Sequence, residues 1–243
     1  MHNTKLMFTV LLAVAFIGAG CTAAVQQNES DTNSAAETTQ QQESTEKQMV
    51  MESSNPDALS ANENDAQYQV NTEESSIQWT GYKIVPKSEH YGTINFESGE
   101  LYVNEEGQVT EGRFVVDMSS IVNEDLENES MNERLVNHLK AEDFFDSAAH
   151  PTSELVFTNI AALEGREDGV THQIAANLTI KGITHNITFP ATISVENGVM
   201  SAQASVSFDR TRWDVQFGSL KFGPDAIVED VITFDVALVA SAQ

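Results

Sequence analysis

The sequence predicts an all-β fold: an antiparallel up-and-down barrel of about eight strands with one short helical insertion. Two observations support this prediction. Apolar and polar residues alternate along most of the chain after residue 67, and period-two alternation is typical of strands with one dry face. Short turn sequences separate the alternating segments. Closing such a sheet removes its exposed edges and encloses room for a small ligand. An open sandwich is the alternative.

The first half of the domain contains four alternating segments, at 76–84, 93–97, 100–104 and 109–118. Gly99 provides a bend between the second and third segments, because glycine weakens a strand at such a point. Residues between the third and fourth segments, Glu105-Glu106-Gly107-Gln108, are typical of a hairpin turn. One face of the fourth segment carries Phe114, Val116 and Met118.

The second half repeats this pattern in five further segments. Pro190 lies inside one of them and predicts an edge or a bulge, because proline cannot donate to a strand ladder. Turns are expected at Lys181-Gly182 and at Glu196-Asn197-Gly198. The residues that share a face are Leu155 and Phe157; Ile174, Ala176, Leu178 and Ile180; Ile187, Phe189, Ile193 and Val195; Met200, Ala202, Ala204, Val206 and Phe208; and Ile232, Phe234, Val236 and Leu238.

An acidic stretch, 123–143, interrupts the alternation between the two halves. Leu135, Val136 and Leu139 follow a helical period and predict a short amphipathic helix. The pair Phe144-Phe145 comes directly afterwards. These two rings either cover one end of the barrel or anchor the helix and its loop to the barrel wall.

The N-terminus has the layout of an export signal, which predicts a signal peptide over residues 1–20. Lys5 precedes an apolar run of about twelve residues, and Gly18-Ala19-Gly20 are small enough for a peptidase cleft. That run is shorter than the roughly 20 residues that a transmembrane helix needs. Cys21, the only cysteine of the chain, stands at the cleavage point, so we expect it to be acylated as the lipid anchor. A plain secretory signal is the alternative.

Residues 21–66 are rich in Gln, Glu, Ser and Thr and contain nine acids and one base, Lys47. Such a composition cannot bury enough apolar surface to fold, so it predicts a disordered, acidic tether or a plain spacer. The remaining residues, 67–243, are long enough for one domain with a core. They hold 28 acids and 10 bases, because nine of the 37 acids and two of the 12 bases precede them. This charge argues against nucleic acid as a partner.

No catalytic or metal-binding signature is present in the sequence. It lacks a G-x-S-x-G nucleophile elbow, a phosphate-binding glycine loop and a dinucleotide fingerprint. The histidines are scattered, without the i, i+4 spacing of zinc enzymes. We therefore expect a protein that is not an enzyme and that holds no metal.

Four segments together resemble the YceI-like family of bacterial envelope proteins, over about residues 68–240. They are Trp79-Thr80-Gly81-Tyr82-Lys83 with His90-Tyr91-Gly92-Thr93; the stretch from Leu135 to Asp146, which contains His138-Leu139 and Asp143-Phe144-Phe145-Asp146; Leu178-Thr179-Ile180-Lys181-Gly182-Ile183-Thr184-His185; and Phe208-Asp209-Arg210-Thr211-Arg212-Trp213-Asp214-Val215 with Phe217-Gly218-Ser219. The resemblance implies a lipocalin-like barrel whose interior takes a long polyisoprenoid chain, such as the tail of a quinone. It does not imply catalysis.

An isoprenoid tail needs a long, dry channel, since each buried CH₂ contributes about 0.8 kcal/mol. The expected wall residues are Trp79, Phe96, Phe114, Phe157, Leu178, Phe189, Phe208 and Phe234. They either line a tunnel or fill the barrel as a core, and a shift of one residue in strand register would turn the other face inward. Arg210, Arg212 and Trp213 lie near a strand end, where the arginines either meet a polar headgroup or pair with Asp209 and Asp214.

These observations predict a lipid-binding lipoprotein of the cell envelope that carries, stores or shields a polyisoprenoid or similar amphiphile. The predicted partners are this apolar ligand, an isoprenoid lipid or quinone, and the membrane that holds Cys21. Thr22 is not an obvious inner-membrane retention residue, which favours the outer membrane, with the domain facing the periplasm or the cell surface. The alternative is a structural or stress-linked envelope protein with a filled barrel.

Overall fold

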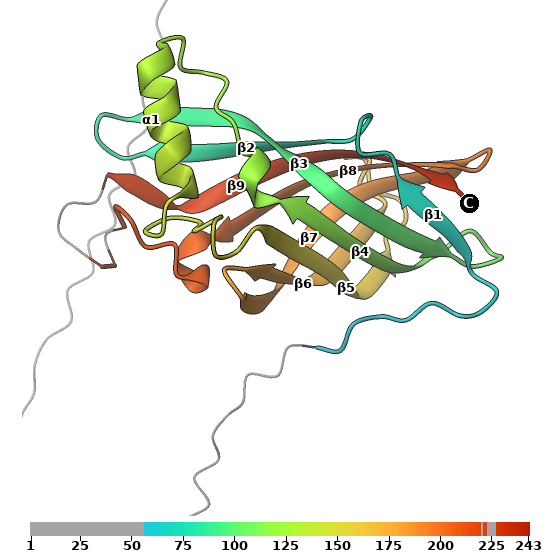
Figure 1. The fold of residues 1–243 in the computed structure, drawn as a ribbon. Coiled ribbons are helices and arrows are strands. Elements are labelled where there is room, and N and C mark those ends of the chain that lie inside the picture. The colour runs from blue at the N-terminus through green and yellow to red at the C-terminus, as the bar shows by residue number, and fades with distance from the viewer. Residues whose placement is uncertain (1–55, 220, 223–226) are drawn as a thin grey trace, which may run out of the picture. The chain divides into compact units, whose positions relative to one another are not determined.

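The structure, a computed structural model, describes residues 56–219, 221–222 and 227–243. The predicted signal peptide, Cys21 and most of the predicted tether lie outside these residues. The described residues form the elements drawn in Figure 1, and none of their helices is long and apolar enough to span a membrane. The elements are β1 (Ala66–Val70), β2 (Ser76–Lys83), β3 (Ser88–Val103), β4 (Val109–Asp117), the 3-10 helix η1 (Met118–Ser120), α1 (Glu129–Lys140), β5 (Thr152–Ala162), β6 (His172–Ile180), β7 (Ile183–Glu196), β8 (Val199–Asp209), the 3-10 helix η2 (Arg210–Trp213) and β9 (Val228–Ala242).

The strands form one antiparallel sheet that closes on itself. Their order is β1-β3-β2-β9-β8-β7-β6-β5-β4, and a further pairing of β3 with β4 completes the ring. β1 and β2 both pair with β3 and with β9, so they share one position, β1 toward one end of the barrel and β2 toward the other. The described strands thus occupy eight positions around the ring. The predicted barrel is confirmed and the sandwich alternative is wrong, although the sequence did not predict β1.

The apolar face of each strand turns inward. In β2, Ile77 and Trp79 are buried while Gln78 between them is exposed. The same holds for β8, where Val206 and Phe208 are buried and Ser207 is exposed. The residues that the alternation groups on one face therefore lie together inside the barrel, and this settles which face is the inner one.

The turn between β7 and β8 shows how local sequence sets the strand connections. Asn197 and Gly198 both have positive φ, 53° and 77°. A two-residue turn of this kind matches the right-handed twist of the flanking strands, and Asn-Gly is the pair that tolerates it best. The predicted hairpin at this position is therefore present, with Glu196 paired to Val199.

The predicted helix is α1, and it lies at one end of the barrel (Figure 1). Asn128 caps it, since its side chain accepts a hydrogen bond from the N–H of Met131 at 3.0 Å. Leu139 is the buried residue of the helix. The chain then turns back so that the N–H of Phe145 donates to the carbonyl of Leu139 at 3.1 Å, which places Phe144 and Phe145 inside the barrel end.

Pro190 marks a place where two strands part. β7 pairs with β8 only from Ala191 to Glu196, and the last pair is Ala191 with Ala204. Past this pair β7 still extends back to Ile183 and β8 on to Asp209, but the two strands no longer pair. Proline has no N–H to donate, so the ladder ends next to it. The predicted edge at Pro190 is present in this form.

The end of the predicted tether, from Pro56 onward, contacts the barrel. Asp65 accepts hydrogen bonds from the hydroxyl of Thr110 at 2.6 Å and from the N–H of Asn62 at 3.0 Å. These two bonds, that from Thr110 first, hold the pKa of Asp65 below its usual value. The carboxylate therefore stays charged and fixes the segment to β4 just before β1 begins.

Candidate functional site

The centre of the barrel is hollow. The space that the centre of a water-sized sphere can occupy there is about 190 Å³. It extends between Leu139 at the α1 end and Leu101 and Leu238 deeper in the barrel. The lining is almost wholly apolar; its polar members are Thr80, Ser153, Glu154 and Gln203. Of these, Ser153 is buried and donates its hydroxyl to the carbonyl of Thr179 at 2.8 Å, so it adds no free polar group to the wall.

Accessibility along the strands confirms that the middle of the interior is not packed. Ala202, Ala204 and Val236 lie on the inward face and line the hollow, yet each remains partly accessible. On the same faces nearer the end of the barrel away from α1, the paired residues Met200 and Ala240 are fully buried. Side chains thus fill the barrel near this end and leave space at its centre.

Eight of the ten predicted ligand-binding residues line this hollow. Many of their rings touch: Phe114 lies 6.2 Å from Phe96 and 5.5 Å from Phe157 between ring centres, and Phe208 stacks on Phe234 at 5.6 Å. The eight residues are Trp79, Phe96, Phe114, Phe157, Leu178, Phe189, Phe208 and Phe234. Their role in ligand binding stays a prediction, but the structure brings them to one cavity.

The wall also contains residues that the sequence did not single out. Among them are Ala191, Ala202 and Ala204, whose small side chains leave space inside the barrel. A search for alanines on the inward face of an otherwise aromatic and aliphatic pattern would have found them. Phe144 and Phe145 line the cavity as well, and both are buried, so of their two expected roles they fulfil that of closing the barrel end.

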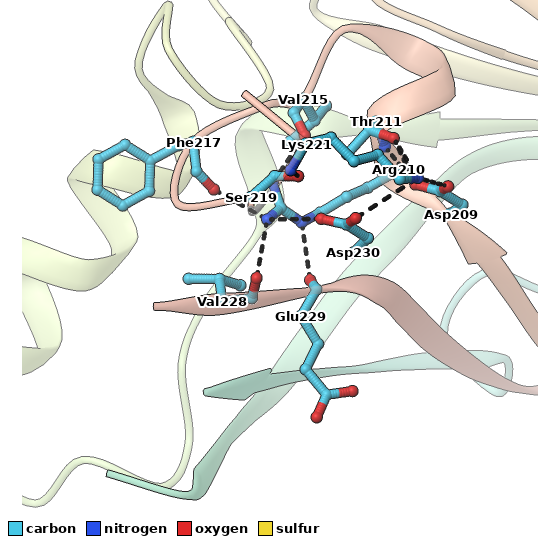
Figure 2. Close-up of polar contacts among 10 residues, drawn as sticks. All are labelled: Asp209, Arg210, Thr211, Val215, Phe217, Ser219, Lys221, Val228, Glu229 and Asp230. Atoms are coloured by element: carbon cyan, nitrogen blue, oxygen red, sulfur yellow. Dashed lines mark hydrogen bonds and ion pairs between the residues drawn. The ribbon is translucent and has the colours of Figure 1, made fainter. Parts of the chain in front are cut away.

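Arg210, by contrast, does not line the cavity. Its side chain is fully buried, and its guanidinium donates to backbone carbonyls (Figure 2). Nε donates to Glu229 at 3.0 Å, Nη1 to Val215 at 2.6 Å, and Nη2 to Phe217 at 2.8 Å. Its Cζ also lies 5.6 Å from the centre of the Phe144 ring. Arg210 thus ties the chain after η2 to the start of β9 and packs against Phe144, which together with Phe145 forms an aromatic plug at the α1 end of the barrel.

Among the described residues, Arg210 forms its ion pair with Asp230 and not with Asp209 or Asp214, the partners that the sequence suggests. Burial lowers the pKa of Arg210, and the nearby charges of Asp230 and Asp209 oppose that shift. Nη2 lies 3.9 Å from Oδ1 of Asp230, and no described group donates a hydrogen bond to this buried oxygen. Lys221 bridges the carboxylates, 3.4 Å from Asp230 and in contact with Asp209 (Figure 2).

Trp213 also lies outside the cavity lining, in the junction where β7 and β8 part. It is fully buried, and its indole N–H donates to the carbonyl of Leu178 at 3.0 Å. Its ring packs against Phe208 at 4.8 Å and His185 at 5.1 Å. The exposed Arg212 lies over the outer side of this ring, 5.1 Å from its centre. Trp213 is therefore a filler of the barrel wall.

Within the described parts of the chain, no three His, Cys, Asp or Glu side chains gather closely enough to hold a metal ion. The histidines instead make local contacts. His90 binds Asp125 at 2.8 Å, and His185 contacts the carbonyl of Arg212 at 2.9 Å.

Comparisons with known proteins agree with this description. A family model for a YceI-like domain matches residues 68–240. Among solved structures, BcnA of Burkholderia cenocepacia is 19% identical with a TM-score of 0.56, over 71% of this chain and 99% of BcnA. A polyisoprenoid binding domain of Saccharophagus degradans, implicated in plant cell wall breakdown, is 12% identical with a TM-score of 0.48, over 72% and 98% of the two chains. A YCEI protein of Campylobacter jejuni is 15% identical with a TM-score of 0.44, over 62% and 84%. No curated protein sequence matches significantly.

Proposed function

The chain belongs to the YceI-like family, and from this membership and the hollow barrel we propose that it binds one long apolar molecule, an isoprenoid lipid or the tail of an isoprenoid quinone. The protein carries, stores or shields this molecule, and catalyses no reaction on it. The cavity is the observation that supports the proposal most strongly.

Water is a poor occupant for such a space. A buried water needs about 10–15 Å³ on the same measure of volume and two to four polar partners. About 190 Å³ leaves room for several waters, but the hydroxyl of Ser153 already has a partner in Thr179. An apolar occupant gains about 0.8 kcal/mol for each CH₂ that it buries, so affinity comes from the length of the tail.

The headgroup contributes less. Arg210, whose Cζ lies 5.6 Å from the centre of the Phe144 ring, donates its guanidinium N–H groups to backbone carbonyls. We therefore expect molecules with similar tails and different headgroups to bind with similar affinity. A barrel without a ligand, the structural alternative, would need this space to be filled by side chains.

We also propose that the protein acts in the cell envelope, held to a membrane by acylated Cys21 and by the acidic segment that follows it. The layout of Lys5, the apolar run and the small residues before Cys21 supports this. A cysteine acylated at the mature N-terminus would add both a glyceride mass and resistance to extraction by salt. Intact-mass measurement of the protein and of a Cys21→Ser variant tests the anchor separately from ligand binding.

The binding proposal is tested by purifying the protein from its native host under mild conditions, extracting it with organic solvent and identifying the extract by mass spectrometry. An isoprenoid chain in near-stoichiometric amount is the expected result. A repeated absence of any long apolar molecule, together with failure to take up an added isoprenoid quinone, would overturn the proposal.

A further inference from the structure

A second junction in the barrel wall lies beside the cavity, between β4 and β5. These strands pair only over residues 113–117 and 152–156. Beyond that point β4 continues to pair with β3 alone, through Val109 to Gly112, and β5 with β6 alone, through Phe157 to Ala162. The two strand edges that face each other there make no ladder bonds to one another.

A short segment from the end of the predicted tether covers this junction. We call residues 56–61 the strap. Its Leu59 N–H donates to the carbonyl of Phe157 at 2.8 Å, the first β5 carbonyl beyond the last β4 pair. Its Ala61 N–H donates to Oε2 of Glu111 on β4 at 2.7 Å. On the other side, the Asn177 amide of β6 donates to the carbonyl of Pro56 at 2.7 Å. The strap thus reaches both sides of the junction, and Figure 1 shows it running along the outside of the barrel before β1.

Phe157 and Leu59 lie at this place, one on the cavity wall and the other on the outside. Phe157 lines the cavity, and its ring occupies the space over Gly112, where a Cβ would approach it to 2.5 Å. Leu59 packs against this core from outside and stays partly exposed. All other strap residues except Ala61 are exposed, so the cover consists mainly of one leucine.

The other openings of the barrel are closed more firmly. At the β7–β8 junction the filler is Trp213, which is fully buried and hydrogen-bonded to Leu178. At the α1 end, the plug residue Phe144 is buried and lies against Arg210. At the far end, Met200 is fully buried. At each of these places the covering residue is itself buried, whereas at the β4–β5 junction the outer cover, the strap, lies on the surface and the ring of Phe157 is the buried part.

We propose that the β4–β5 junction is the portal through which the apolar ligand reaches the cavity, and that Leu59 is its removable cover. This inference rests on the proposed function, because it assigns the route to the same binding site. The strap lifts away with Leu59, the ring of Phe157 rotates, and the tail passes between the unpaired strand edges. The segment that leads toward the predicted membrane anchor is then also the part of the chain that opens the barrel.

A cover that contacts the wall in both the free and the loaded protein has a clear kinetic signature. Removing it lowers the barrier for loading and for release by the same amount, and it leaves the equilibrium between the two states unchanged. A residue that binds the ligand directly would instead weaken affinity, mainly through faster release. Loading and release rates therefore distinguish the two roles.

The test uses the full chain and a ubiquinone with a tail of two isoprene units, which quenches tryptophan fluorescence when it reaches Trp79 in the cavity wall. Leu59→Ser should raise the loading rate and the release rate each by about fivefold, with the dissociation constant changed less than about twofold. Glu111→Ala, which removes the acceptor of the Ala61 N–H, should act in the same direction. Ala58→Ser, at the exposed neighbouring position, is the matched control and should behave as the wild type.

The outcomes distinguish failure of the portal inference from failure of the proposed function on which it rests. Unchanged rates in both Leu59→Ser and Glu111→Ala, with normal quenching at equilibrium, would overturn the portal and leave the proposed function standing. A dissociation constant raised with the release rate alone would show that Leu59 is a ligand contact, which also overturns the portal. Absence of quenching in every form, wild type included, would overturn the portal and the proposed function together. If Leu59→Ser does not fold, Glu111→Ala carries the same prediction.

Discussion

The indole N–H of Trp79 donates to the backbone carbonyl of Val122 at 3.0 Å. Trp79 belongs to the inner face of β2 and lines the cavity, whereas Val122 lies in the loop between η1 and α1. The loop also pairs with β3, since the N–H of Val122 donates to the carbonyl of Thr93 at 3.0 Å. This loop is therefore part of the barrel wall. Its carbonyl fixes the orientation of the Trp79 ring, which lines the cavity.

Gly92 makes this arrangement possible. It pairs with Trp79 across β2 and β3, and a Cβ at this position would lie 2.0 Å from the carbonyl oxygen of Val122. Backbone cannot yield as a flexible side chain can, so Gly92→Ala should lower the free energy of unfolding by about 1–3 kcal/mol, as overpacking does. Urea denaturation measures this. Gly81→Ala, where nothing lies within 4 Å of the added Cβ, should stay within about 1 kcal/mol of the wild type; equal losses at both positions would refute the close packing of the loop.

Replacing Arg210 should destabilise the plug end of the barrel. Arg210→Met leaves the carbonyls of Val215 and Glu229 without their donors and leaves Asp230 without its buried counter-charge. Each buried acceptor left without a partner costs about 1–3 kcal/mol, and thermal and chemical unfolding should both report a loss of about 2–6 kcal/mol for the two carbonyls. Arg212→Met is the matched control, because the exposed Arg212 contributes only its contact with Trp213, worth at most about 1 kcal/mol. A small effect of Arg210→Met would mean that water replaces the guanidinium.

How far the sequence predicts this structure depends on the range of the interactions concerned. Ile232 and Phe234 are placed correctly by alternation, because the pleat alone puts residues two apart on one face. Asn197-Gly198 is placed correctly because the turn needs two positive φ angles. Both features are decided within a few residues of the chain, so the local pattern contains them.

Arg210 and Leu59 show what the pattern lacks. Arg210 follows directly on β8, and its partners are carbonyls of residues up to 19 positions away, which no local period encodes. Leu59 is a single apolar residue in a polar stretch, and its contact with Phe157, 98 positions along the chain, arises only because β4 and β5 part. The contacts of both residues form only once the barrel has closed. The sequence therefore suggested a headgroup contact for Arg210 and a free tether around Leu59, and predicted neither of the observed contacts.

The stability of the α1 end should depend on pH through Asp125. Burial alone would raise the pKa of Asp125, but hydrogen bonds from His90, Asn123 and the Tyr91 N–H outweigh it and hold the pKa below its usual value. A carboxyl group with a lowered pKa in the folded state stabilises the protein above its unfolded pKa, and this contribution is lost as the pH falls through the folded value. The free energy of unfolding should therefore fall between about pH 5 and pH 2, and less steeply in Asp125→Asn.

The comparison for Asp125→Asn is Glu105→Gln, at an exposed position in the β3–β4 turn. Chemical denaturation at a series of acidic pH values gives the slopes for all three proteins. Glu105→Gln should follow the wild type. If Asp125→Asn also follows it, the hydrogen bonds of Asp125 do not favour the charged form.

A larger side chain in the cavity tests whether the barrel is a hollow container or a packed core. Ala204 lies on the inward face of β8, lines the hollow and is partly accessible, so a larger side chain has space to occupy. In a packed core, a small-to-large change costs about 1–3 kcal/mol; in this barrel Ala204→Phe should leave the free energy of unfolding unchanged or raise it. The same ring takes the place of the ligand tail, so uptake of an isoprenoid quinone should weaken by at least about tenfold, equivalent to about 1.4 kcal/mol. Ser205→Phe, on the exposed face next to it, should bind as the wild type does. A variant that is destabilised at Ala204 and still binds normally would mean that side chains already fill the barrel centre and that the ligand lies elsewhere.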